Sequence, residues 1–109
     1  RAAGAQFSLG KSFRGFGPIG PSLVTPDELS DPSNLEIGCR VNGEEMQRSR
    51  TNDLIFGIPA LIEQLSAILP LLPGDVILTG TPSGVGPIQS GDRLEVRIQG
   101  LAPLVNTVK

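Results

Sequence analysis

The clearest alternation of apolar and polar positions lies in the middle of the chain, between residues 35 and 49. Apolar residues occupy every second position of its first half: Leu35, Ile37, Cys39 and Val41. The dipeptide Asn42-Gly43 follows, and it is typical of the two-residue type I′ turn, because both central residues of that turn adopt positive φ. We therefore predict a β-hairpin whose regular register places Cys39 opposite Met46.

The next apolar pattern has the spacing of an α-helix. Its residues recur at steps of three and four: Ile58, Leu61, Ile62, Leu65, Ile68 and Leu69. Pro59 is tolerated in the first helical turn, where its missing N–H has no intrahelical partner, and Pro70 ends the segment. We predict one principal helix, which buries its apolar stripe against a sheet.

Three later segments have strand patterns. Residues 75–79 are apolar on both faces, which predicts a buried strand. Residues 92–100 alternate as a half-exposed antiparallel strand does, and residues 103–109 predict one more strand. Residues 1–34 are rich in Gly and Pro and have no period, so we expect loop there, with short extended runs at 7–13 and 22–24. The fold class is therefore mainly β with one principal helix, that is, α+β.

Composition limits the partners and the compartment. A chain of 109 residues predicts a single domain, 1–109, and its net charge of −2 without a run of basic residues argues against nucleic acid or an anionic membrane surface. No apolar stretch is long enough to span a bilayer. The single cysteine, Cys39, cannot form an internal disulfide, which favours a reducing, cytoplasmic location.

The chain contains no histidine, and this limits its chemistry. Histidine is the usual general base near neutral pH and a common metal ligand, so catalysis here must use lysine, carboxylates, hydroxyls or backbone groups. Glu44 and Glu45 are adjacent on a predicted strand and point to opposite faces, so they cannot hold one ion together. From the residues alone we assign no metal ligand.

A glycine-rich segment, GDVILTGTPSGVG at residues 74–86, is the best candidate for a binding loop. A phosphate-binding P-loop needs lysine and a hydroxyl residue after its second glycine, but Val85 and Gly86 follow Gly84. The glycine spacing also misses the dinucleotide fingerprint. Ser83 lies outside a nucleophile-elbow pattern. The ligand of this loop is therefore not decided by local motifs.

Several motifs taken together resemble the fumarylacetoacetate hydrolase family. They are GKSF, VNGEEMQ, NDLIFGIPALIEQLS, and GDVILTGTPSGVG followed by GDRLEV, in that order. The match is to the C-terminal half, in the acylpyruvase and 2-hydroxyhepta-2,4-diene-1,7-dioate isomerase-like branch. The resemblance implies part of a mixed β roll or sandwich, usually dimeric, with a Mg²⁺ or Mn²⁺ centre. Its reactions include hydrolysis of C–C bonds in acylpyruvates, decarboxylation of oxaloacetate and isomerisation in aromatic catabolism.

The same resemblance assigns roles to particular residues. It implies that Lys11 of GKSF stabilises the negative charge of an enolate, and that Thr81 binds the carboxylate of a small 2-oxo acid. It also implies that Gly80 and Gly84 let the backbone approach the substrate. These roles agree with the general chemistry of oxyanion stabilisation by cations, hydroxyls and amides.

Other parts of the family site are expected outside this chain. The resemblance implies that the metal ligands and a substrate-clamping Arg and Gln lie upstream of the GKSF motif. We therefore expect a fragment of a longer enzyme, inactive alone, that forms a homodimer or associates with its N-terminal half. Arg14 stands where many bacterial members have aspartate. The alternative is a non-catalytic β domain that serves as a dimerisation or binding module.

Overall fold

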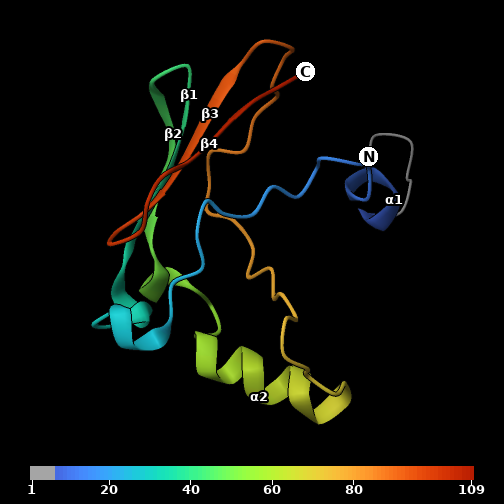
Figure 1. Cartoon of the computed structure of the whole chain (residues 1–109), viewed down its shortest axis with the longest axis vertical. Coiled ribbons are helices and arrows are strands. Elements are labelled where there is room, and N and C mark those ends of the chain that lie inside the picture. Colours follow the sequence, from blue (N-terminus) through green and yellow to red (C-terminus); the bar gives the residue numbers. More distant parts are fainter. Residues whose placement is uncertain (1–6) are drawn as a thin grey trace.

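The computed structural model describes residues 7–109, and their side chains from residue 8 onward (Figure 1). Its helices and strands are α1 (Phe7–Lys11), β1 (Glu36–Val41), β2 (Glu44–Arg50), α2 (Ile58–Ile68), β3 (Arg93–Ile98) and β4 (Leu104–Thr107). Three short 3-10 turns cover Pro26–Glu28, Pro32–Asn34 and Thr51–Asp53. None of the helices in residues 7–109 has the length and apolar character needed to cross a membrane.

The strands form one antiparallel sheet of four strands in the order β2-β1-β3-β4. The predicted hairpin, the strand at 92–100 and the terminal strand are all confirmed, and so is the α+β class. Asn42 (φ 51°) and Gly43 (φ 84°) have the positive φ values that a type I′ turn requires. The Asn42 side chain donates to Asp92 (2.8 Å) and accepts from the Arg93 N–H (2.9 Å), so the hairpin turn is bonded to the start of β3.

The predicted register of the hairpin is correct at its turn and wrong beyond it. Arg40 pairs with Glu45, but Cys39 pairs with Gln47, so Met46 is an extra residue at a β-bulge. A bulge sets two residues of one strand against one of the other and changes which side chains share a face. Gln47 therefore takes the place opposite Cys39 that simple alternation assigns to Met46.

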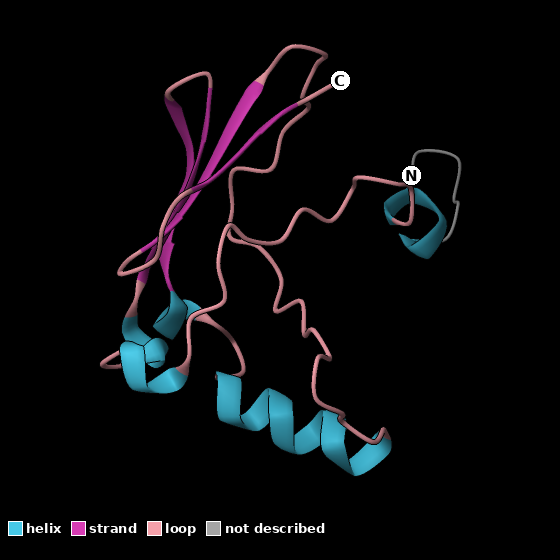
Figure 2. Ribbon diagram, in the orientation of Figure 1, coloured by secondary structure: helices cyan, strands magenta, loops and turns pink. Residues whose placement is uncertain are grey.

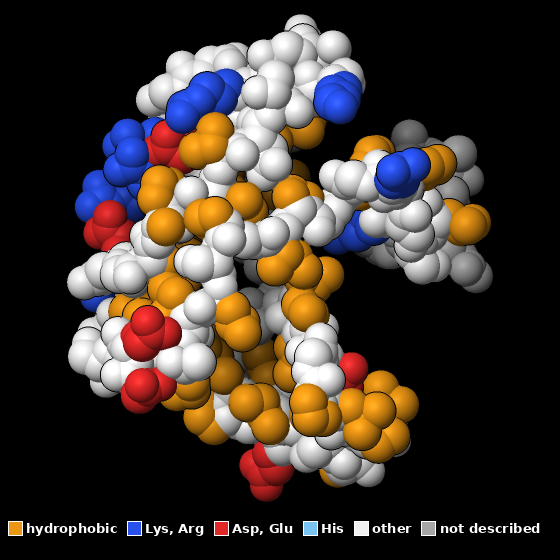
Figure 3. Space-filling model, viewed as in Figure 1, with side chains coloured by type: hydrophobic (Ala, Val, Ile, Leu, Met, Phe, Trp, Pro, Cys, Tyr) orange, Lys and Arg blue, Asp and Glu red, His pale blue; other side chains and the backbone are white. Residues whose placement is uncertain are grey.

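One face of the sheet is charged, and Figure 3 shows basic and acidic side chains gathered over the strands. Glu95, only 9% exposed, lies at its centre and is hydrogen-bonded by Arg93 and Arg97. The hydrogen bond from Arg97 is the main cause that lowers the pKa of the Glu95 carboxyl. We call this surface the charged face.

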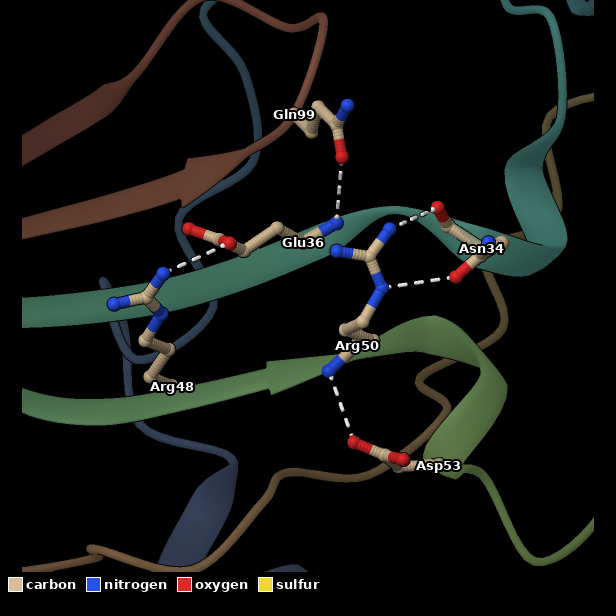
Figure 4. A network of polar contacts seen from close by, with 6 residues as sticks. All are labelled: Asn34, Glu36, Arg48, Arg50, Asp53 and Gln99. Carbon is tan, nitrogen blue, oxygen red and sulfur yellow. Dashed lines mark hydrogen bonds and ion pairs between the residues drawn. The ribbon is translucent and has the colours of Figure 1, made fainter.

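Polar contacts also fix the end of the sheet where β1 begins and β2 ends (Figure 4). Arg50 donates from Nε and Nη2 to the side-chain and backbone oxygens of Asn34, both at 2.9 Å. The Arg50 backbone N–H donates to the Asp53 carboxylate (3.1 Å). Arg48 forms an ion pair with Glu36 (3.1 Å). The Glu36 backbone N–H donates to the side-chain oxygen of Gln99 (3.1 Å). These contacts tie the two neighbouring 3-10 turns to the strands.

Helix α2 begins and ends as predicted, but its expected burial is wrong. Gly57 caps the N-terminus, Pro59 lies in the first turn, and the helix stops before Pro70. No residue of α2 is buried, and Ile62 is 45% exposed. In Figure 1 the helix stands away from the strands. The apolar stripe shows that this face needs a partner, and the sheet of residues 7–109 does not supply one.

The predictions for residues 75–79 and residues 7–13 are also wrong. Residues 75–79 form no strand and belong to the long loop between α2 and β3 in Figure 2, where Val76 is 61% and Leu78 88% exposed. A strand needs a neighbour with free backbone groups, and within the described residues none pairs with this segment. Helix α1 replaces the extended run expected at 7–13, whereas residues 22–24 lie in a loop.

Candidate functional site

A cavity of about 700 Å³ opens on the face of the sheet opposite the charged face. Its floor is formed by apolar side chains of two neighbouring strands: Ile37 and Cys39 of β1, and Val96 and Ile98 of β3. Its walls are the loop 79–82 and the segment 49–56, with Leu61 of α2 at one side. We call this space the sheet cavity. Burial raises the pKa of the Cys39 thiol, so the floor is uncharged at neutral pH.

Two of the four predicted site residues, Gly80 and Thr81, line the sheet cavity. Gly80 has φ 99°, a conformation that favours glycine. The Gln47 side chain crosses from β2 to this loop, and its Nε2 donates to Thr81 Oγ1 (2.9 Å) and to the Pro82 carbonyl oxygen (2.8 Å). The loop is thus held by a side chain that the sequence analysis did not single out.

Gly84 follows the loop that forms the cavity wall, and the structure shows why this position requires glycine. Its φ is 100°, and a Cβ there would overlap the Met46 carbonyl oxygen and lie 3.0 Å from the carbonyl carbon. The close backbone approach at Gly84 is therefore to the bulge of β2. A contact between Gly84 and substrate stays a prediction.

Lys11 is not among the residues that line the sheet cavity. It is the last residue of α1, which lies apart from the sheet in Figure 1. The connection from α1 to the first 3-10 turn, residues 12–25, contains no helix or strand that would fix α1 against the cavity. The structure therefore brings Gly80 and Thr81 together but not Lys11, whose role in catalysis stays a prediction.

Ser49 and Asp53 add polar groups to the cavity wall that the sequence analysis missed. The Ser49 hydroxyl donates to the Asp53 carboxylate at 2.6 Å, and the Arg50 N–H donates to the same oxygen. The Ser49 hydrogen bond is the main cause that lowers the pKa of Asp53. The sequence signal for this pair is the S-x-x-x-D spacing at the end of β2.

The donor set of the cavity does not fit a divalent metal by itself. Asp53 is the one carboxylate among the lining residues, and its Oδ2 already accepts two hydrogen bonds. Within residues 7–109, no group of three or more His, Cys, Asp or Glu side chains is arranged to hold an ion. Mg²⁺ and Mn²⁺ prefer several oxygen ligands, so these residues alone do not make such a site.

The sequence model of the fumarylacetoacetate hydrolase C-terminal region matches residues 1–109. The chain belongs to the fumarylacetoacetate hydrolase family. This confirms the resemblance found in the sequence motifs, and it places the sheet cavity in a family whose relatives are hydrolases, isomerases and tautomerases of small organic acids.

Three relatives illustrate the range of the family. The chain is 47% identical over 112 residues to the mitochondrial oxaloacetate tautomerase FAHD2A of Bos taurus, covering 96% of this chain and 36% of that protein. It is 50% identical to 5-carboxymethyl-2-hydroxymuconate delta-isomerase from Mycobacterium smegmatis, with a TM-score of 0.80 and coverage of 85% and 36%. It is 41% identical to maleylpyruvate hydrolase from Sphingobium sp. SYK-6 in complex with manganese (II) ion and pyruvate, with a TM-score of 0.83 and coverage of 85% and 35%.

The chain matches less than half of each of these relatives, so the activities of those whole proteins are only proposals for this chain. The chain spans between 36% and 48% of the length of the curated relatives considered. Among these relatives, the maleylpyruvate hydrolase structure contains a manganese (II) ion.

Proposed function

We propose that this chain is the C-terminal part of a metal-dependent enzyme that acts on small 2-oxo acids or their enols. The reaction would be C–C bond hydrolysis of the acylpyruvate type, decarboxylation of oxaloacetate, or isomerisation. The observation that carries the proposal is the position of Thr81 and Gly80 in the wall of an apolar-floored cavity, in a chain of this family. We propose a cytoplasmic location from the composition alone, because the single cysteine cannot form an internal disulfide.

In this proposal, the sheet cavity holds the carboxylate end of the substrate. Hydroxyl and amide donors of the 79–82 loop stabilise a carboxylate, and the apolar floor accommodates the carbon skeleton and excludes water. Lys11 would stabilise the enolate once its segment approaches the cavity. Mg²⁺ or Mn²⁺ would polarise the 2-oxo group, held by residues other than those described here.

A second candidate, a non-catalytic module for dimerisation or binding, is favoured by a different observation. Large apolar side chains are exposed over α2 and the loop that follows it, among them Ile62, Ile68, Leu72 and Leu78. Exposed apolar patches of this kind mark interaction surfaces. The same surface would serve a homodimer or association with an N-terminal half, so it is compatible with both candidates.

The two candidates are separated by comparing the chain alone with a longer protein that carries an upstream half like that of its relatives. Turnover of oxaloacetate and an acylpyruvate is measured with Mg²⁺ or Mn²⁺. We expect metal-dependent turnover by the longer protein and none by the chain alone. Turnover by neither protein favours the binding module. Equal turnover by both would show that the metal ligands lie within this chain, against the proposal.

A further inference from the structure

We propose that Gln47 is a positioning residue: it fixes the direction in which the Thr81 hydroxyl donates its proton, so that this proton faces a ligand carboxylate in the sheet cavity. The inference rests on the proposed function, because it describes how that site holds its carboxylate. Gln47 is the last residue of the VNGEEMQ motif, but the sequence analysis assigned it no role.

The orientation of the Gln47 amide follows from its two partners. Nε2 lies 2.8 Å from the Pro82 carbonyl oxygen, which can only accept a hydrogen bond, so the amide nitrogen and not the oxygen faces the loop. The same nitrogen lies 2.9 Å from Thr81 Oγ1. Both Nε2 hydrogens are therefore used, one for each partner.

The direction of the Thr81 proton follows in turn. A hydroxyl has one proton and two lone pairs, and one lone pair of Thr81 Oγ1 accepts from Gln47. The hydroxyl proton must therefore point away from Gln47. Because Thr81 lines the sheet cavity, that proton is available to a group bound there. A donor fixed in this way favours an anionic acceptor, because a hydrogen bond to an anion is stronger than one to a neutral group.

Gln47 is itself held in place by the surrounding backbone. The bulge at Met46 puts Gln47 opposite Cys39 and turns its side chain to the cavity face of β2. Gln47 Cγ lies 3.1 Å from the point that a Cβ at Gly84 would occupy, so the loop packs directly on the Gln47 side chain. The bulge, the glycine and the amide therefore act together, and a donor held in this way loses little entropy when a ligand binds.

The test uses the longer protein described above and pyruvate, the simplest 2-oxo carboxylate, as the probe. The variants are Gln47→Met, Thr81→Val and the double variant, with Gln64→Met on the exposed side of α2 as the matched control. We expect Gln47→Met to weaken pyruvate binding by about tenfold or more, as for loss of a hydrogen bond to a charged group. The Michaelis constant for oxaloacetate should rise more than kcat falls.

The double variant separates positioning from simple structural support. If Gln47 acts through Thr81, Gln47→Met should change pyruvate affinity little once Thr81 is valine. Equal losses in both backgrounds would overturn the inference. So would a large effect of Thr81→Val with none of Gln47→Met. Absence of pyruvate binding by the unmodified protein would overturn the proposed function as well.

A second variant covers the case in which Gln47→Met does not fold. Gln47→Glu keeps the size of the side chain, but its carboxylate accepts a hydrogen bond from the Thr81 hydroxyl and so withdraws the proton from the cavity. Pyruvate binding should be weak at neutral pH and recover as the pH falls and the glutamic acid becomes a donor. A pH profile identical to that of the unmodified protein would contradict the proposal.

Discussion

The four-stranded sheet and the region from α2 to residue 86 both have regular apolar patterns in the sequence. They differ in how far their backbone and apolar side chains find partners in the structure. Every strand of the sheet finds its partner among residues 36–107. On its charged face, Arg48 pairs with Glu36, and Arg93 and Arg97 both pair with Glu95. Helix α2 and residues 75–79 have strong apolar patterns but remain largely exposed. The comparison teaches that a local pattern can determine a helix or a hairpin, whereas strand pairing and burial require a second surface that the pattern does not identify.

The largest expected effect concerns the contact between Gly84 and the bulge of β2, where the exposed region packs against the sheet. Gly84→Ala would drive a Cβ into the Met46 carbonyl and would also require alanine at φ 100°. We expect the free energy of unfolding of the 79–86 segment to fall by about 3 kcal/mol. Gly80→Ala is the matched control, because φ is 99° there but no atom lies within 4 Å of the added Cβ. Its cost should be about 1–2 kcal/mol.

Chemical denaturation and pyruvate binding, measured on both glycine variants, check this difference. If the two variants lost equal stability, the contact between Gly84 and the bulge would contribute nothing, and the loop would be as loosely held as α2.

The next effect tests how strongly the hairpin turn is coupled to β3. Asn42→Ala removes two hydrogen bonds, to Asp92 and from the Arg93 N–H, and places alanine at positive φ. We expect a loss of about 1–3 kcal/mol in the free energy of unfolding, measured by urea titration. Asn52→Ala, at an exposed position, should change it by no more than about 0.5 kcal/mol. Equal losses would mean that the sheet is not stabilised through this turn.

A smaller effect is expected in α2. Leu65 is only half-buried, so Leu65→Ala in the chain alone should reduce the free energy of unfolding by less than about 2 kcal/mol. In a longer or dimeric protein that covers the helix, the same change should cost about 2–5 kcal/mol. Thermal unfolding of both forms measures the difference. An equal, small cost in both would show that the face of α2 stays exposed in the larger protein.

The smallest effect concerns acid. The pKa of Glu95 is lowered in the folded state, first by the Arg97 hydrogen bond, so the unfolded chain binds a proton more readily. This stabilisation is fully present above the ordinary glutamate pKa of 4.5 and is lost as the pH falls through the lower, folded value. Melting temperatures between pH 7 and pH 3 should fall, and Glu95→Gln should flatten part of that fall. An unchanged acid slope would mean that Glu95 is not coupled to folding.

The sequence predicted those features that depend on neighbouring residues. Asn42-Gly43 identified the turn, and the three- and four-residue spacing with Pro59 and Pro70 identified α2. The alternation in β3 predicted its two faces. All of these follow from periodicity and turn chemistry over short distances along the chain.

The features that the sequence did not predict depend on distant partners. The apolar run at 75–79 predicted a buried strand. A strand also needs a neighbouring strand with unpaired backbone groups, and the apolar pattern does not reveal whether one is present. Gly80 and Thr81 were found through the family motif and do line the cavity. Gln47 was missed because its role arises from a bulge and from a loop more than thirty residues away, at Thr81 and Pro82.

The extra residue at Met46 also limits which changes of length β2 can tolerate. Substitutions leave each side chain on its own face of the sheet. Inserting or deleting one residue between Gln47 and Ser49 would instead exchange the faces, and Arg48 or its neighbour would enter the apolar cavity. Deleting Met46 itself would keep Gln47 opposite Cys39, but it would remove the bulge against which Gly84 packs. When relatives are aligned to this chain, the position of a gap in β2 is therefore more informative about the cavity than the percentage of identical residues.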